Sequence, residues 1–407
     1  MKTKEKVVLA FSGGLDTSFC VKYLSEDLGM EVHSAIVQTG GFSQPELDEI
    51  AQRAFGLGVA SHQVLDETQA YYQNCIRYLI FGNILRNHNY PLSVSSERIF
   101  QALAIAHYAR KMEAQAVAHG STGAGNDQVR FDLAFRVLAP ELKIITPIRD
   151  LQLSREAEIK YLQEKGVEGN WEKSLYSINQ GLWGTSVGGK ETLSSNLPLP
   201  NEAFPSPLKQ ENSQAITLHF QAGELVGLDN DQDMDPIKAI QTLEKIASEY
   251  AIGRDMHVGD TIIGIKGRVG FEAAAAQIII GAHRLLEKHT LSKWQMHWKE
   301  QLANWYGMFL HEAQYLDPVM RNIEGFLRDT QKHVSGQVFV KLLPYRFELM
   351  GIKSDDDLMQ AKFGSYGEMN NAWTGEDVKG FTKILSNSLN IYYSTHPEER
   401  KNDEGKN

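Results

Sequence analysis

An apolar run that leads straight into a pair of glycines is the feature that most constrains this chain. Val7–Phe11 is continuously apolar, as expected for a strand that is covered on both faces of a sheet. The segment SGGLDTS, residues 12–18, follows directly, and apolar residues then recur at helical spacing. A tight strand-to-helix turn explains one glycine and one helix cap. Two glycines flanked by hydroxyl groups favour a phosphate-binding loop, because the free N–H groups of a helix N-terminus bind anions.

Strands and helices alternate from this point to about residue 150. Further strands are expected at residues 32–37, 59–66, 114–119 and 143–146, with helices between them. This alternation predicts crossover connections, a parallel sheet and therefore an α/β fold.

After about residue 170 the pattern changes to that of an α+β domain. Residues 184–213 are rich in Gly, Ser, Asn and Pro, which predicts a long ordered loop or an inter-domain stretch, and TIIGIKGR (261–268) predicts a strand. The C-terminal region predicts one amphipathic helix over 379–396 and a solvated tail over 397–407. For a chain of 407 residues we therefore expect a nucleotide-binding domain (1–170), a substrate-binding domain (171–365) and a C-terminal helix with its tail (366–407).

Composition narrows the function classes. A net charge of −10 and a pI of about 5.8 argue against a broad nucleic-acid or membrane surface. Cys20 and Cys75 show no metal-ligand spacing, and two cysteines exclude a disulfide framework, which fits a reducing cytoplasm. The N-terminal apolar stretch ends after five residues, so no signal peptide or membrane span is predicted.

A second glycine-rich segment, VAHGSTGAGNDQVRFDLA, covers residues 117–134. Another flexible turn is the simpler interpretation. However, three glycines interspersed with hydroxyl, amide, carboxylate and guanidinium groups suit a zwitterionic ligand. Asp127 could hold an ammonium group, and Arg130 could bind a carboxylate through two parallel hydrogen bonds.

Together, SGGLDTS, HGSTGAGNDQVRF and LAPELKIITPIRD resemble the argininosuccinate synthase family of the PP-loop ATP pyrophosphatases. The resemblance implies an adenine nucleotide alpha hydrolase-like N-terminal domain, an α+β synthetase domain and a C-terminal oligomerisation helix. It implies ligation of citrulline with aspartate in arginine biosynthesis, through a citrullyl-adenylate, giving argininosuccinate, AMP and pyrophosphate. ATP with Mg²⁺ is expected as a substrate, with no organic prosthetic group and no metal held by the protein alone. The family's tetramers imply a homotetramer joined through the C-terminal helix.

The resemblance also assigns residues to the three substrates. ATP would be held by Ala10, Phe11, Ser12, Gly13, Gly14, Leu15, Asp16, Thr17, Ser18, Val37 and Gly120. Aspartate would be bound by Thr122, Asn126 and Asp127. Citrulline would be bound by Tyr90, Ser95, Asn126, Arg130, Ser177 and Ser186, with Gly259 and Phe271 in the same pocket. No side-chain nucleophile is needed, so Ser12, Asp16 and Arg98 are expected to position substrates and to stabilise phosphate charge.

Two of these positions depart from the family pattern. Gly259 stands where the family has Glu, and Phe271 stands where it has Tyr. One interpretation is a rearranged pocket in which Asp260 supplies the carboxylate. The other is a substrate without a free α-ammonium group, because a buried ammonium that lacks a partner is costly. Citrulline acylated on its α-nitrogen would meet this condition, and Gly259 would make room for the acyl group.

Two further functions stay open at this level. A nucleotide-binding regulatory protein without ligase activity would also tolerate the two departures. Another PP-loop enzyme is the third hypothesis, although the chain has no room for the glutaminase domain of a GMP synthetase. It also lacks the paired cysteines and basic face of tRNA-thiolating enzymes. Aspartate-dependent release of pyrophosphate would separate an enzyme from a sensor.

Overall fold

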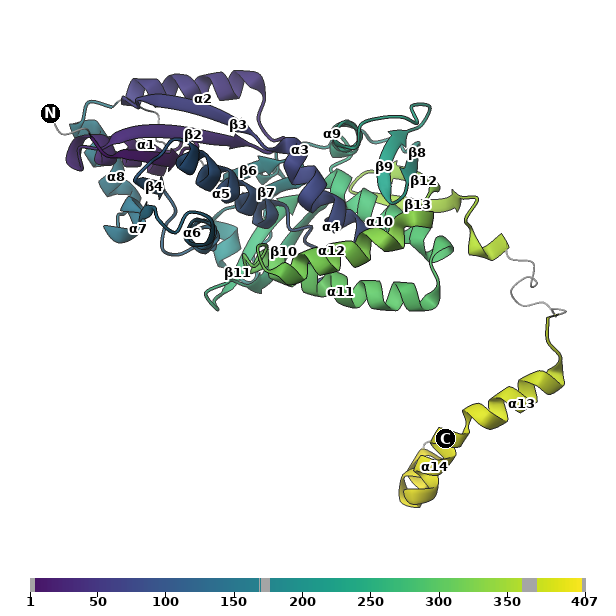
Figure 1. Ribbon diagram of the computed structural model, residues 1–407. Coiled ribbons are helices and arrows are strands. Elements are labelled where there is room, and N and C mark those ends of the chain that lie inside the picture. The colour runs from purple at the N-terminus through teal and green to yellow at the C-terminus, as the bar shows by residue number, and fades with distance from the viewer. Residues whose placement is uncertain (1–3, 168, 170–175, 361–371, 405–407) are drawn as a thin grey trace. The chain divides into compact units, whose positions relative to one another are not determined.

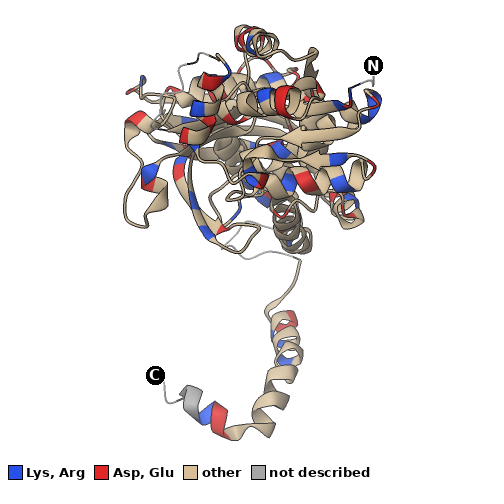
Figure 2. Ribbon diagram, turned by 90° about the vertical axis from the view of Figure 1, so that its left-hand side faces the viewer, with Lys and Arg blue, Asp and Glu red and all other residues tan. Residues whose placement is uncertain are grey.

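The computed structural model describes residues 4–167, 169, 176–360 and 372–404. The chain forms two compact units, Met1–Asp356 and Asp357–Asn407 (Figure 1). Acidic and basic residues are interspersed along the described ribbon of the first unit, without a region of one sign (Figure 2). Among the helices of the described ranges, none combines the length and the apolar character needed to cross a membrane.

The N-terminal part of the first unit contains a five-stranded sheet, in which each strand is parallel to its neighbours. Its strands are β1 (Lys6–Ala10), β2 (Glu31–Gln38), β3 (Ser61–Asp66), β4 (Ala116–His119) and β5 (Lys143–Ile145). Their order across the sheet is β3-β2-β1-β4-β5. The prediction of an α/β fold with a parallel sheet is confirmed.

Helices cover both faces of this sheet (Figure 1). On one face lie α1 (Leu15–Lys22), α2 (Gln44–Leu57), α7 (Pro147–Asp150) and α8 (Arg155–Glu164), and on the other lie α5 (Ser93–Lys111) and α6 (Asp127–Leu138). Strand β1 contributes side chains to the hydrophobic clusters on both faces of the sheet, because alternate side chains of a strand point to opposite faces. Val7 and Leu9 belong to one core cluster and Val8 to the other, which explains why the run had to be continuously apolar.

The rest of the first unit contains two antiparallel four-stranded sheets, ordered β10-β11-β7-β6 and β13-β12-β8-β9. Their strands are β6 (Ser177–Gly181), β7 (Gly184–Gly188), β8 (Gln214–Gln221), β9 (Glu224–Leu228), β10 (Arg254–Asp260), β11 (Lys266–Glu272), β12 (Gly336–Leu343) and β13 (Arg346–Lys353). The helices in this part are α3 (Thr68–Tyr71), α4 (Arg77–Phe81), α9 (Pro236–Ser248), α10 (Ala274–Thr290), α11 (Lys293–His311) and α12 (Pro318–Thr330). One large apolar cluster joins these helices to the sheet of β8, β9, β12 and β13 and to Phe271 of β11.

Two sequence predictions in this region are wrong. The segment expected to be a loop from residue 184 begins with strand β7, which is hidden by its glycines but lies between β6 and β11 with a buried face. The strand expected over 261–268 is mostly a turn. Thr261 N–H donates to Ile265 O at 2.8 Å and Gly264 has φ +84°, so β11 begins only at Lys266. The strand was predicted because this turn contains three isoleucines, and an apolar run is typical of a buried strand.

The second unit contains α13 (Gly375–Leu385), α14 (Asn387–Thr395) and α15 (Pro397–Glu404). The single helix expected over 379–396 is divided at Ser386, and the expected tail is helical up to Glu404. Pro397 explains the start of the last helix, since proline suits the first helical position.

Candidate active site

The two glycine-rich segments meet where the strand order of the parallel sheet reverses. Strands β1 and β4 are neighbours, with Ala10 paired to His119 at their carboxyl ends. The chain leaves β1 toward α1 on one face, and α5 and α6 flank β4 on the other. In open α/β sheets, ligands bind in the crevice that this reversal leaves beyond the carboxyl ends of the strands.

The first loop is held rigid by its own hydroxyl groups. Gly13 has φ +77°, a conformation that favours glycine, and Gly14 is the N-cap of α1. Ser18 Oγ and Thr17 Oγ1 donate to Gly14 O at 2.8 and 3.3 Å. Ser12 Oγ lies 3.4 Å from Thr17 Oγ1. The N–H groups at the start of α1 therefore sit in a fixed frame, open to an anion.

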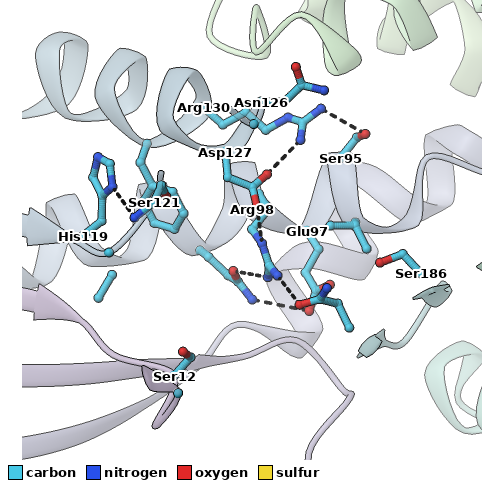
Figure 3. A pocket seen from close by; sticks show the side chains of 18 of the residues that line it. Ser12, Ser95, Glu97, Arg98, His119, Ser121, Asn126, Asp127, Arg130 and Ser186 are labelled. Carbon is cyan, nitrogen blue, oxygen red and sulfur yellow. Dashed lines mark hydrogen bonds and ion pairs between the residues drawn. The ribbon is translucent and has the colours of Figure 1, made fainter. Parts of the chain in front are cut away.

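The second loop lies against α1 because Gly120 has no side chain. A Cβ at Gly120 would lie 3.3 Å from the backbone carbon of Asp16 and from Thr17 Cγ2. Ser121 N–H donates to Nδ1 of His119 at 3.2 Å, so the other ring nitrogen, Nε2, carries the proton that faces Asp132 Oδ1 at 2.9 Å. Figure 3 shows His119 turned toward Ser121, which fixes the start of the loop.

A network of two guanidinium groups around one carboxylate forms the centre of the site (Figure 3). Arg98 Nε donates to Asp127 Oδ2 at 3.1 Å, and Arg130 Nη1 donates to Oδ1 at 3.0 Å. Burial alone would raise the pKa of Asp127, but the two guanidinium groups outweigh it and hold this pKa below its ordinary value. Arg130 also donates to Ser95 Oγ at 3.1 Å, and Arg98 to Asn179 Oδ1 at 2.8 Å. Asp127 is therefore a fixed anion between two fixed cations.

A continuous cavity of about 1170 Å³ joins the two loops to the β10–β11 hairpin. It exceeds the roughly 300–1,000 Å³ of a usual single-ligand pocket, so more than one substrate can be accommodated. Most of the residues assigned to the substrates line it: Ala10, Phe11, Ser12, Gly14, Leu15, Asp16, Thr17, Val37, Tyr90, Ser95, Arg98, Gly120, Thr122, Asn126, Asp127, Arg130, Ser186 and Gly259.

Four assigned residues do not line this cavity. Ser18 is fully buried, and its hydroxyl group donates a hydrogen bond to Gly14 O. Gly13 has a positive φ angle, and a side chain there would point toward Ile50. Phe271 is fully buried behind Tyr90, with ring centres 5.4 Å apart. Ser177 is exposed at the start of β6. The structure does not place these four residues against the cavity.

Other lining residues escaped the sequence analysis. Asn179 lies directly opposite Ser186 in the β6–β7 pairing, and a recognised hairpin would have revealed it. Glu97 precedes Arg98, is buried and accepts a hydrogen bond from Thr39 Oγ1. Burial raises its pKa above the ordinary value, against the opposing effects of Arg98 and Thr39. His257 and His311 reach the cavity from distant segments, so no local pattern marks them.

Comparisons with known proteins agree with this geometry. Residues 6–168 match the family model "Arginosuccinate synthase N-terminal HUP domain", and residues 176–392 match "Arginosuccinate synthase C-terminal domain". The argininosuccinate synthase of Methanocaldococcus jannaschii is 35% identical over 364 residues, covering 89% of this chain and 91% of that protein. Those of Xanthomonas campestris and Dictyoglomus thermophilum are 35% and 36% identical, and each alignment covers 96% of this chain and 99% or 98% of the relative. Both halves of the chain, including the sheet and loops that build the cavity, thus belong to the argininosuccinate synthase family.

Proposed function

We propose that the chain ligates a citrulline to aspartate at the expense of ATP, giving an argininosuccinate, AMP and pyrophosphate. One observation carries this proposal. The phosphate-binding loop and the Arg98–Asp127–Arg130 network open into the same cavity, so a nucleotide and two amino acids can meet there. The named relatives carry the same activity in their names.

The ATP half of the site follows from the first loop. The triphosphate lies on the N–H groups that open α1, where the helix dipole stabilises negative charge. Ser12 and Thr17 add hydroxyl groups at the same edge of the cavity. These donors are in place before the reaction, so they stabilise pyrophosphate as it leaves without reorganising.

Magnesium is expected with ATP, and the residues beside the loop fit it. Glu158 shares a hydrogen bond with Asp16, and its Oε2 atom is buried without a hydrogen-bond partner in the described structure. Burial and the neighbouring Asp16 raise the pKa of Glu158 to about 8. Two carboxylates together with substrate phosphates are a typical Mg²⁺ ligand set, so Asp16 and Glu158 would hold it. Bound there, the ion supplies charge neutralisation for the phosphates.

The proposed reaction has two steps, adenylation of the ureido oxygen and displacement of AMP by aspartate. The ureido oxygen of citrulline forms a bond to the α-phosphorus of ATP, and the bond to the bridging oxygen breaks to release pyrophosphate. The amine of aspartate, having lost a proton, then forms a C–N bond to the ureido carbon, and the C–O bond to AMP breaks. Asp127 and Asn126 orient aspartate, while Ser95 and Arg130 orient the ureido group, so the chain contributes mainly alignment and charge stabilisation.

The second unit supports a homotetramer. Its helices expose the apolar side chains of Val378, Phe381, Ile384, Leu385, Leu389, Ile391 and Tyr392. Apolar residues at helical spacing favour burial against another surface. We propose that they pack on neighbouring copies, which light scattering of the full chain and of a chain ending at Asp356 would test.

The experiment that tests the activity follows both products and one labelled atom. Purified protein is mixed with ATP, Mg²⁺, aspartate and citrulline or its N-acyl derivatives, and AMP and pyrophosphate are measured. An ¹⁸O label in the ureido group is expected to appear in the phosphate of AMP, because that oxygen forms the new bond to phosphorus. ATP binding without aspartate-dependent pyrophosphate release would refute the proposal and identify a nucleotide sensor.

A further inference from the structure

One face of the β10–β11 hairpin lines the cavity without a charged side chain. We use "hairpin wall" for the four cavity-lining residues that share one face of the β10–β11 pair: His257, Gly259, Gly267 and Val269. Gly259 lies directly opposite Gly267, so one cross-strand pair has no side chains. Tyr90 packs on this face with its ring centre 5.0 Å from that of His257. A substrate meets two glycines, a valine and two aromatic rings here, and none of them is charged at pH 7.

Within the hairpin wall, the open place is at Gly267. A Cβ at Gly259 would lie 2.7 Å from His257 Nε2, because the imidazole already covers that position. A Cβ at Gly267 would meet only Thr261 Cγ2, at 3.4 Å. The expectation that Gly259 makes room for an acyl group is therefore wrong, and the free space lies instead at Gly267, which pairs with Gly259 across the hairpin.

Each carboxylate that lines the cavity in the described part of the chain already has a partner or is assigned to another substrate, as Asp127 is assigned to aspartate, so none is left for an ammonium group on the ureido substrate. Among the described residues, five carboxylates line the cavity. Asp16 lies in the phosphate loop, and Glu46 caps α2 through Ser43. Glu97 accepts from Thr39, and Asp127 is held by its two guanidinium groups. Asp260, the alternative for the missing carboxylate, is paired with Lys266 Nζ at 2.7 Å.

Cations surround the same end of the cavity. Burial, with Arg86, lowers the pKa of His257 to about 4. Burial, with Arg130 and Arg86, lowers the pKa of His311 to about 3, so both rings are neutral at pH 7. Arg268 donates to two backbone carbonyl oxygens, and no carboxylate in the described ranges forms an ion pair with it. Burial is the main reason that the imidazoles are neutral, and Arg86 and Arg130, which add to that effect, also disfavour an ammonium group and attract a carboxylate.

We propose that the ureido substrate is a citrulline acylated on its α-nitrogen, which meets the hairpin wall as an uncharged amide. This inference rests on the proposed function and names its substrate class. Acylation removes the one positive charge of citrulline and leaves both carboxylate and ureido group intact, so the two reaction steps are unchanged. A dicarboxylic acyl group adds a carboxylate that Arg268 can attract.

Competition kinetics of the full-length protein test this proposal. Pyrophosphate release is measured with ATP, Mg²⁺, aspartate and one of three substrates: citrulline, N-acetylcitrulline or N-succinylcitrulline. We expect kcat/KM for an acylated form to exceed that for citrulline by about tenfold or more, because an unpaired ammonium group is costly. A higher kcat/KM for the succinyl form than for the acetyl form would indicate that Arg268 binds the second carboxylate. The reverse order would indicate that the site recognises the uncharged amide without this contact.

The outcomes separate the inference from the function on which it rests. A kcat/KM for free citrulline that equals or exceeds both acylated forms overturns the inference and leaves the proposed function standing. Absence of pyrophosphate release with all three substrates overturns both.

A matched pair of variants locates the α-nitrogen. Gly267→Glu supplies a carboxylate in the open place, and Gly267→Gln supplies the same volume without charge. Both are expected to lower kcat/KM for the acylated substrates, and Gly267→Glu alone is expected to raise it for citrulline, by about tenfold. Equal effects of the two variants on citrulline would contradict the placement of the α-nitrogen at this wall.

Discussion

Gly14 offers a test of the phosphate loop that separates function from folding. It is the N-cap of α1, with φ −77° and ψ 179°, a conformation that alanine adopts without strain. A Cβ there would meet only Ser12 Oγ, at 3.6 Å. We therefore expect Gly14→Ala to change the free energy of unfolding by less than about 1 kcal/mol, because the gain from restricting the unfolded chain is offset by the weakness of alanine as an N-cap.

The same methyl group should impair ATP binding. Gly14 lines the cavity beside the N–H groups that open α1, so a methyl group there displaces phosphate oxygens. Loss of one charge-assisted hydrogen bond costs about 1.5–3 kcal/mol, which corresponds to a rise of about 10- to 150-fold in the Kd for ATP. Calorimetry measures that Kd, urea denaturation measures stability, and pyrophosphate release measures turnover.

Gly29→Ala is the matched control. Gly29 has φ +66° with nothing within 4 Å of a Cβ, so alanine is strained there, at a cost of about 1–2 kcal/mol, while the cavity is untouched. We expect lower stability and an unchanged Kd for ATP. If Gly14→Ala binds ATP with the wild-type Kd and turns over normally, the assignment of this loop to phosphate is refuted.

Four further predictions concern charged side chains at three positions. Asp127→Asn leaves two guanidinium groups without their anion and should raise the KM for aspartate by about 10- to 100-fold in initial-rate assays; an unchanged KM would remove Asp127 from the aspartate site. The pKa of Glu158 is raised from 4.5 to about 8, so the free energy of unfolding should fall as the pH rises between these values, and Glu158→Gln should flatten that slope in urea titrations. Binding of ATP with Mg²⁺ at pH 7 should also release a proton from Glu158, seen by calorimetry in buffers of different ionisation enthalpy; equal release from Glu158→Gln would contradict this. Lys299→Met leaves Glu287, its fully buried partner at 2.8 Å, uncompensated and should cost about 3–5 kcal/mol of stability by urea denaturation, whereas a loss below 1 kcal/mol would contradict a charged pair.

Local patterns predicted the parts of the site that local sequence builds. The phosphate loop follows from a doubly covered strand, two glycines and a helix start, all within thirteen residues (7–19). Asp127 and Arg130 are one helical turn apart, so their proximity follows from spacing, but the ion pair between them was not predicted, because each had been assigned to a substrate. Strand β7 was missed because its burial comes from β6 and β11 on either side, and glycine content alone indicates a loop.

The sequence by itself determined the parallel sheet, the glycine turn between β1 and α1, and the family, because hydrophobic period and glycine placement act over a few residues. Only the tertiary structure decided which charges meet. Strand order brings residues 12–18 beside 120–126, and the β10–β11 hairpin brings His257 and Gly267 to a cavity whose loops lie more than a hundred positions earlier. The electrostatic environment of the hairpin wall is set by charged side chains from segments that are far apart in the sequence. No window of sequence contains it, and our proposal for the substrate rests on this property.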